Sequence, residues 1–399
     1  MEIYDIIHGN IIIDELAKRI IDTEEFQRLR SIKQLGCCNY VFPSAVHTRF
    51  EHSIGVYHLA KKYISILNTN GQFTKQNIKC ITIAALIHDI GHGPYSHLFD
   101  EVVSKEKYHE YRSIEILKYI VKKYGFDITE EEIIEICCMI DPKKYEIKNE
   151  QKYIYQIVSN ENGIDVDRFD YIMRDIKMTG LNYGIEYERI MNNSVIVDGE
   201  IVYYEKIQTS IEEFYRIRYI MYKEVYNHHT VRAIEFMMKE YIHLLDIYLG
   251  ISEIIELDEW EKFIKLNDSI IHILPFMHKS DKLNEMKKIL QNIHTRKIYK
   301  SVGEIITHKK INMNDIYKEF NNINGKYING KYIIDCIKLS YYSNEKCKYI
   351  LGRECRDLTK EIIHHDKYVT SIYYKNEEDK EEAIKMFNKI KRRKYLFNL

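Results

Sequence analysis

Proline and glycine are scarce in this sequence, and no sign of charge dominates. The 399 residues include only 4 Pro and 16 Gly, and 45% are hydrophobic, which excludes collagen-like and largely disordered classes. Lys and Arg number 59 against 60 Asp and Glu, so a surface built wholly for nucleic acid is not expected. The longest apolar run, residues 80–87, is interrupted only by Thr82 and is too short to span a bilayer. We therefore expect no contact with a membrane.

Cysteine is present but not patterned for disulfides or for zinc. The eight Cys include two adjacent pairs, Cys37-Cys38 and Cys137-Cys138, and form no CxxC motif. Met1 leads directly into residues of mixed polarity, so we expect no signal peptide. Together these features favour a reducing compartment, cytoplasmic or nuclear.

The apolar spacing predicts a mostly helical chain with a smaller mixed part. Helices are expected over 50–67, 78–90, 166–176 and 211–249, where apolar residues recur at helical intervals. Hairpins are expected at 194–204 and 327–333, and a strand at 368–374. We predict a helical domain over residues 1–255 and an α+β lobe over 256–399 that packs on it.

The densest chemical signal is the segment His88-Asp89-Ile-Gly91-His92, which follows an apolar helix and leads to His97. An imidazole and a carboxylate that are adjacent at a helix end can both reach a metal placed over that end, and His92 stays near it. The alternative is a group of structural histidines at a helix end, but His rarely fills apolar positions without a partner.

Two other segments could complete the coordination shell. Arg49 and His52 lie three residues apart at the start of the first predicted helix, which places a cation beside a potential ligand. Asp167, Tyr171 and Asp175 form a stripe beside an apolar helix face, where carboxylates are costly to bury without a cation. A set of His and Asp ligands suits Fe, Mn, Ni or Mg better than a structural Zn. Such a metal would support hydrolysis, with the remaining histidines as phosphate partners and proton donors.

The motifs together resemble the HD-domain deoxynucleoside triphosphate (dNTP) triphosphohydrolases. The chain is most similar to the catalytic core of the branch that also carries a sterile alpha motif, without that motif. The resemblance covers nearly the whole chain and rests on residues 21–23, 26–30, 32–36, 40–43, 49–53, 88–97, 153–160, 162–167 and 296–304. It implies a helical HD phosphohydrolase core that hydrolyses dNTPs to deoxynucleoside and inorganic triphosphate.

The resemblance also implies roles for individual residues. Its metal ligands correspond to His52, His88, Asp89 and Asp167, and its catalytic and phosphate-contacting groups to Arg49, His92, His97, Asp100 and His109. Among these, His97 is our candidate for the general acid, with Asp100 orienting it. Gln34 and Asp175 correspond to residues that bind the sugar 3′-OH. Leu35 and Tyr171 correspond to residues that crowd the 2′ position. The phosphate and base contacts correspond to Arg168, Arg218 and Tyr226.

Regulation by nucleotides is the least complete part of the resemblance. A guanine-nucleotide activator site would use Asp22, Gln27 and Arg30, and a second, dNTP activator site would use Arg189, Lys206 and His228. Tyr204 and Glu224 replace arginines expected at the second site, which should weaken triphosphate binding. We expect a homodimer, with tetramerisation driven by GTP or dNTP altered or absent.

Two other functions remain open from the sequence. Another HD phosphohydrolase, acting on nucleoside monophosphates or cyclic nucleotides, would share the metal ligands. A non-catalytic protein that binds nucleotides or nucleic acid would draw on the basic residues 385–394, although such residues also suit a helix C-terminus. Retention of every metal ligand favours the enzyme.

Overall fold

The computed structural model describes residues 1–103, 106–145, 149–276, 281–310, 330–340, 347–351, 354–356 and 367–397. The chain forms two compact units that do not follow its order. One comprises residues 1–217, 242–279 and 342–360, and the other comprises residues 218–241, 280–341 and 361–399. The division of the sequence at residue 255 therefore stays a prediction.

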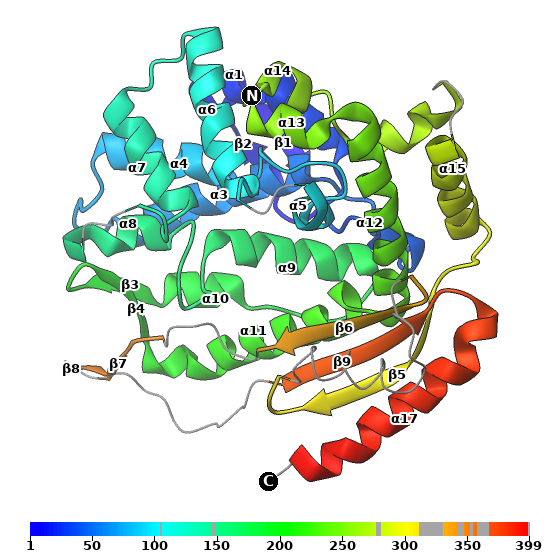
Figure 1. The fold of residues 1–399 in the computed structure, drawn as a ribbon. Coiled ribbons are helices and arrows are strands. Elements are labelled where there is room, and N and C mark those ends of the chain that lie inside the picture. The colour runs from blue at the N-terminus through cyan, green and yellow to red at the C-terminus, as the bar shows by residue number, and fades with distance from the viewer. Residues whose placement is uncertain are drawn as a thin grey trace. The chain divides into compact units, whose positions relative to one another are not determined.

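The first unit is helical and contains every helix that surrounds the predicted metal ligands (Figure 1). Its longer helices are α3 (Arg49–Leu67), α4 (Lys75–Ile87), α6 (His109–Tyr124), α7 (Glu130–Ile140) and α9 (Val166–Thr179). Shorter helices are α1 (Glu15–Ile21), α2 (Glu24–Gln27), α5 (His97–Val103), α8 (Lys152–Gln156), α10 (Tyr187–Asn192), α13 (Ile251–Glu256) and α14 (Trp260–Phe263), with a 3-10 stretch over Asp268–Phe276. Helix α11 (Gln208–Met221) begins in the first unit and ends in the second. Helix α12 (His229–Leu249) begins in the second unit and ends in the first.

Among the described residues, the first unit also contains two small sheets, one of two strands and one of four. Strands β1 (Glu2–Asp5) and β2 (Gly9–Ile12) form an N-terminal hairpin that the sequence did not reveal, because four-residue strands show little alternation. The predicted hairpin at 194–204 is confirmed as β3 (Ser194–Val197) and β4 (Glu200–Tyr204). Strand β4 also pairs in parallel with β7 (Tyr349–Leu351), and β7 pairs antiparallel with β8 (Glu354–Arg356).

The second unit holds a three-stranded antiparallel sheet in the order β5-β9-β6. Its strands are β5 (Lys300–Thr307), β6 (Tyr332–Leu339) and β9 (Lys367–Tyr374), the last confirming the strand predicted at 368–374. Ile372 packs with Ala383 and Met386 of α17 (Lys380–Phe397), whereas Tyr373 packs with Phe236 of α12. Successive side chains of β9 therefore pack on opposite faces of the sheet. Helix α15 (Asp281–His294) precedes β5. Part of the hairpin predicted at 327–333 lies outside the described residues.

The predicted helix over 211–249 is wrong as one continuous element. Helix α11 ends at Met221, a π-helical turn follows over Tyr222–Tyr226, and α12 begins at His229. Apolar spacing alone did not signal this interruption, because no Pro or Gly marks it. Arg218 and Tyr226, eight residues apart, therefore do not lie on one continuous α-helix.

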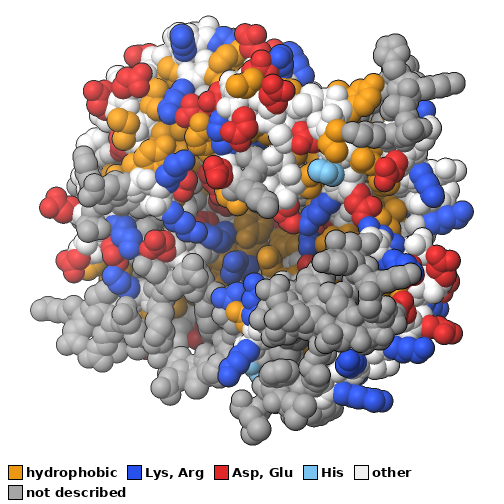
Figure 2. Space-filling view, in the orientation of Figure 1, with side chains coloured by type: hydrophobic (Ala, Val, Ile, Leu, Met, Phe, Trp, Pro, Cys, Tyr) orange, Lys and Arg blue, Asp and Glu red, His pale blue; other side chains and the backbone are white. Residues whose placement is uncertain are grey.

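The described surface agrees with the balanced composition. Figure 2 shows acidic and basic side chains mixed over the visible face, in keeping with a net charge near zero. Among the described helices, none combines the length and the apolar character needed to cross a bilayer. Each cysteine whose side chain is described is a free thiol.

Candidate metal centre and nucleotide site

Three helix ends bring the predicted metal ligands together. Helix α3 begins with a capping box in which the Glu51 side chain accepts from the backbone N–H of Thr48, and this fixes His52 in the first turn. His88 is the C-cap of the apolar helix α4, with Asp89 next to it. Asp167 lies in the first turn of α9, whose N-cap is Asp165. These caps are local, so each ligand is held by its own stretch of sequence.

The ligand atoms face one another at distances suited to a shared cation. His52 Nε2 lies 3.2 Å from His88 Nε2 and 3.2 Å from Asp167 Oδ1, and His88 Nε2 lies 3.5 Å from the same Asp167 oxygen. Asp89 Oδ2 lies 3.4 Å from His52 Nε2. Ligands about 2.1 Å from an octahedral ion, at right angles, are about 3 Å apart. His52, His88 and Asp167 therefore form a group that could hold one metal ion, and Asp89 Oδ2 lies beside both histidines.

The hydrogen bonds of the two imidazoles strengthen this fit. His52 Nδ1 lies 2.8 Å from Asp170 Oδ2, and His88 Nδ1 lies 2.9 Å from the carbonyl oxygen of Ala85. Both partners are acceptors only, so both Nδ1 atoms carry the proton and both Nε2 lone pairs face the centre in the neutral rings. Two lone pairs and two carboxylates would repel one another unless a cation lay between them.

The electrostatics of the centre also favour metal binding. Burial by itself would lower the pKa of His52, but hydrogen bonds to Asp167, Asp170 and Asp89 outweigh it and hold the pKa well above its usual value. Burial by itself would raise the pKa of Asp89, but the charge of Arg49, followed by those of His88 and His92, lowers it well below its usual range. Asp89 therefore stays an anion, which is the form in which a carboxylate binds a metal.

The loop after His92 contacts Arg49, the first residue of α3, at the centre. The Arg49 guanidinium pairs with Asp89 and donates from Nε to Ser96 Oγ over 2.8 Å. Tyr95 and Ser96 both have positive φ, which is unfavourable for these residues. Asp268 holds them there by accepting from the backbone N–H of Tyr95 over 2.7 Å. This strained loop therefore depends on a residue 173 positions away.

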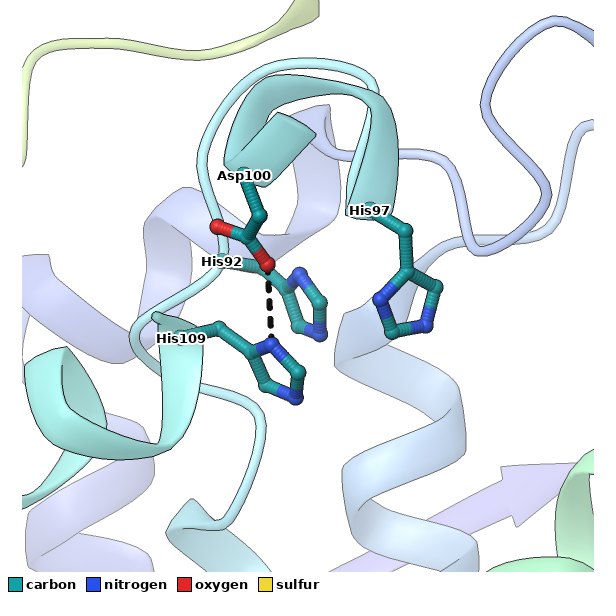
Figure 3. A group of neighbouring side chains, drawn as sticks. All are labelled: His92, His97, Asp100 and His109. Atoms are coloured by element: carbon teal, nitrogen blue, oxygen red, sulfur yellow. Dashed lines mark hydrogen bonds and ion pairs between the residues drawn. The ribbon is translucent and has the colours of Figure 1, made fainter. Parts of the chain in front are cut away.

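A second cluster lies in the same unit and joins three of the predicted catalytic histidines to Asp100 (Figure 3). The rings of His92 and His109 stack with centroids 3.8 Å apart, and His97 meets both edge-on. His109 Nδ1 donates to Asp100 over 2.9 Å. In the described contacts Asp100 therefore orients His109, and not His97 as the sequence interpretation had it.

The three imidazoles differ in environment. Burial, followed by the charges of Arg49 and His109, lowers the pKa of His92 well below its usual value. Its ring is buried. Nε2 lies 3.3 Å from Asp89 Oδ1, and Nδ1 has no hydrogen-bond partner among the described residues, which marks a place where a ligand could bind. His97 is solvent-accessible, and desolvation, followed by the charges of His109 and Arg49, lowers its pKa as well.

The pairing of Asp100 predicts an acid-dependent loss of stability. Burial alone would raise the pKa of Asp100, but bonds from His109 and Arg112 lower it to about 2. Because the folded value lies below the unfolded one, the stabilisation is complete above about pH 4 and is lost as the pH falls toward 2. We expect the wild type to lose about 2 kcal/mol more than Asp100→Asn over this range, measured by urea unfolding. Parallel pH dependences of the two proteins would contradict the assignment.

The comparisons with known proteins agree with this geometry. An HD domain matches residues 49–175, and an HD associated region matches residues 185–324. The chain belongs to the HD-domain family that includes the SAMHD1 proteins. The deoxynucleoside triphosphate triphosphohydrolase SAMHD1 homolog of Dictyostelium discoideum is 36% identical over 356 residues, which cover 86% of this chain and 68% of that protein. The match to the HD domain confirms the predicted helical fold.

Two further relatives show how widely this HD-domain sequence extends. A putative HD domain-containing protein of Acanthamoeba polyphaga mimivirus is 40% identical over 338 residues, covering 75% of this chain and 72% of the relative. The human deoxynucleoside triphosphate triphosphohydrolase SAMHD1 is 32% identical over 397 residues, covering 86% of this chain. The match spans 63% of the human protein's length.

In this HD-domain protein, the two residues predicted to read the sugar are joined by a residue that the sequence did not single out. His47 Nε2 donates to Asp175 Oδ1 over 2.7 Å, and the carbonyl oxygen of His47 accepts from the backbone N–H of Gln34 over 3.0 Å. His47 is buried, as are Gln34 and Asp175. The partners His47 and Asp175 are 128 residues apart, so no local pattern could have indicated the pair.

The other predicted substrate contacts are less tightly assembled. Leu35 follows Gln34, and Tyr171 is half-buried between Asp167 and Asp175 along α9. Arg168 is turned toward the N-cap Asp165, with which it pairs. Arg218 and Tyr226 belong to the second unit, and their roles stay predictions.

The residues predicted for a guanine-nucleotide site line one cavity. Asp22, Gln27 and Arg30 surround a space of about 550 Å³ together with residues of the N-terminal hairpin and of α3. Arg30 donates to Gln27 Oε1 over 2.8 Å, and its guanidinium lies 3.5 Å from the centroid of the Phe50 ring. Of the residues predicted for the second site, Arg189 lies on α10, Lys206 follows β4, and His228 stacks on His229 in the second unit.

Proposed function

We propose that this protein hydrolyses dNTPs to deoxynucleoside and inorganic triphosphate. The observation that carries the proposal is the convergence of the His52 and His88 Nε2 atoms on the carboxylates of Asp89 and Asp167, beside a histidine cluster and a buried arginine. The relatives named as dNTP triphosphohydrolases, matched over most of this chain, supply the substrate class.

In this proposal the four ligands hold a divalent metal, with Fe, Mn, Mg and Ni all suited to the ligand set. When bound, the metal would polarise a phosphoryl oxygen and lower the pKa of water. Arg49, held by Asp89 and Ser96, neutralises phosphate charge. His92, whose Nδ1 has no described partner, binds phosphate oxygens or water, and the accessible His97 donates a proton to the departing 5′ oxygen. His109, oriented by Asp100, supports them.

Around the sugar, Gln34 and Asp175 would bind the 3′-OH, while Leu35 and Tyr171 exclude a 2′-OH. Arg168, Arg218 and Tyr226 would contact the triphosphate and the base. The cavity lined by Asp22, Gln27 and Arg30 would take a guanine nucleotide, since its arginine and aromatic ring suit phosphate and base. At a second activator site, Arg189, Lys206 and His228 would bind a dNTP weakly, in a homodimer with altered or absent tetramerisation.

Product analysis tests this function. The purified protein is incubated with each dNTP and Mn²⁺ or Mg²⁺, with and without GTP, and the control is His88→Ala/Asp89→Ala. We expect deoxynucleoside and triphosphate from the wild type and none from the control. Orthophosphate or diphosphate would indicate another HD phosphohydrolase. Nucleotide binding without hydrolysis under any condition would indicate a sensor.

The bridge from His47 to Asp175 predicts a change in sugar selectivity. In His47→Leu the Asp175 carboxylate loses its donor, so we expect the preference for a dNTP over its 2′,3′-dideoxy analogue to fall about tenfold, the worth of one charged hydrogen bond. The measurement is the ratio of kcat/KM for the two substrates. His47→Gln, whose amide can still donate, should retain most of the preference. An unchanged ratio in His47→Leu would exclude this role.

A further inference from the structure

We propose that the N-terminal hairpin is a functional part of the metal centre. Through Asp5 and His8 it holds the carboxylate of Asp170, and Asp170 is the positioning residue of the metal ligand His52. The inference rests on the metal centre of the proposed function. It concerns residues outside the HD domain match at 49–175 as well as one within it.

The first step is the contact between Asp170 and His52. Asp170 Oδ2 lies 2.8 Å from His52 Nδ1, and both side chains are completely buried. This bond keeps the proton on Nδ1, leaves the Nε2 lone pair directed at the centre, and fixes the plane of the ring. Asp170 lies on α9 three residues after Asp167, and its described contacts are with His52, His8 and Arg174.

The second step is what holds Asp170. Arg174 donates from Nε and Nη2 to the two carboxylate oxygens of Asp170, each over 2.9 Å, and from Nη1 to Asp5 Oδ2 over 2.8 Å. His8 Nε2 lies 2.7 Å from Asp170 Oδ1. Thus Asp170 receives bonds from three residues, and one of these residues belongs to the turn between β1 and β2, 162 positions away.

The third step is the rigidity of the hairpin turn itself. Asp5 Oδ1 accepts from the backbone N–H groups of Ile7 and His8 over 2.8 and 2.9 Å, so one carboxylate both closes the turn and binds Arg174. On α3, Gly55 leaves the space for this network, since a Cβ there would lie 1.9 Å from Asp170 Oδ1 and 2.6 Å from Arg174 Nη2. A larger residue at position 55 would therefore displace the Asp170–Arg174 pair.

Structural support alone would not require this arrangement. Arg174 and Asp170 could neutralise each other without His8 or Asp5, and a buried ion pair contributes little to stability when an apolar pair could replace it. What the network adds is a single position for the His52 ring. Partners of this kind, behind a metal ligand, typically change metal affinity by about 10- to 100-fold when removed.

The test is the affinity for Mn²⁺ of the metal-free full chain, measured by calorimetric titration. Asp170→Asn keeps the shape and one acceptor oxygen but loses the charge, and we expect its Kd for Mn²⁺ to rise about 10- to 100-fold. His8→Phe should raise the Kd severalfold, and His8→Gln, which keeps a donor toward Asp170, should restore it. The matched control is His58→Phe, because His58 packs on His8 with ring centroids 5.2 Å apart but has no described hydrogen bond to Asp170.

The outcomes separate the inference from the proposed function. If folded Asp170→Asn binds Mn²⁺ as the wild type does, the positioning role is overturned. If Asp170→Asn does not fold, the His8 variants decide: wild-type affinity in His8→Phe, or equal losses in His8→Phe and His58→Phe, overturns the role of the hairpin. If the wild type binds Mn²⁺ but releases no triphosphate, the proposed reaction fails, while the affinity differences among the variants still decide the inference.

Discussion

Asp167→Asn is expected to lose bound metal and, with it, at least about 100-fold in triphosphate release. Asp167 supplies the oxygen that lies 3.2 Å from His52 Nε2 and 3.5 Å from His88 Nε2, and it comes from a different helix than either histidine. An asparagine keeps the size of the side chain but removes its charge. The two imidazoles and Asp89 alone would then hold a divalent ion weakly. The measurements are metal content after dialysis and the rate of triphosphate release.

The matched control for this variant is Asp141→Asn. Asp141 is half-buried at the C-cap of α7 and belongs to neither His and Asp cluster among the described residues. It should keep wild-type metal content and rate. If Asp167→Asn retains its full complement of metal, Asp167 is not a ligand, and the centre must be built from the other three residues.

Gly91→Ala is expected to destabilise the fold by about 3 kcal/mol and to reduce activity with it. A Cβ on Gly91 would lie 2.3 Å from both the carbonyl oxygen of His109 and the backbone N of Ser113. These are backbone atoms at the start of α6, which cannot move aside as a flexible side chain can. The Gly91 N–H also donates to Ser113 Oγ, and its carbonyl oxygen accepts from Arg112. Moving α6 would displace His109 from His92.

Urea unfolding of Gly91→Ala beside Gly184→Ala measures this effect. A Cβ on Gly184 would meet nothing within 4 Å, and its backbone is not in the left-handed region, so that variant should unfold like the wild type. A loss of stability below about 1 kcal/mol in Gly91→Ala would show that α6 can shift at little cost. Close packing would then not explain the glycine at position 91.

Local patterns in the sequence located the long helices α3, α4 and α9 and suggested the residues of the proposed metal centre. The helix predicted at 50–67 is α3, and that at 166–176 lies within α9, because an apolar stripe and a polar N-cap are features of neighbouring residues. The ligands could be predicted because each sits at a helix end with its own signal. By contrast, the π-helical turn after Met221 and the short β1–β2 hairpin left no such signal.

By itself, the sequence determined which residues carry the chemistry, and only the tertiary structure decided which residues hold them in place. The bonds from His47 to Asp175, from His8 to Asp170 and from Asp268 to Tyr95 join residues 128, 162 and 173 positions apart. The same is true of Asp100, which the family resemblance pairs with His97 but which binds His109 at the start of the next helix. Periodicity and capping report interactions within one or two turns of the chain. The partner of a buried polar group is set by the packing of whole helices, which brings distant residues within hydrogen-bonding distance.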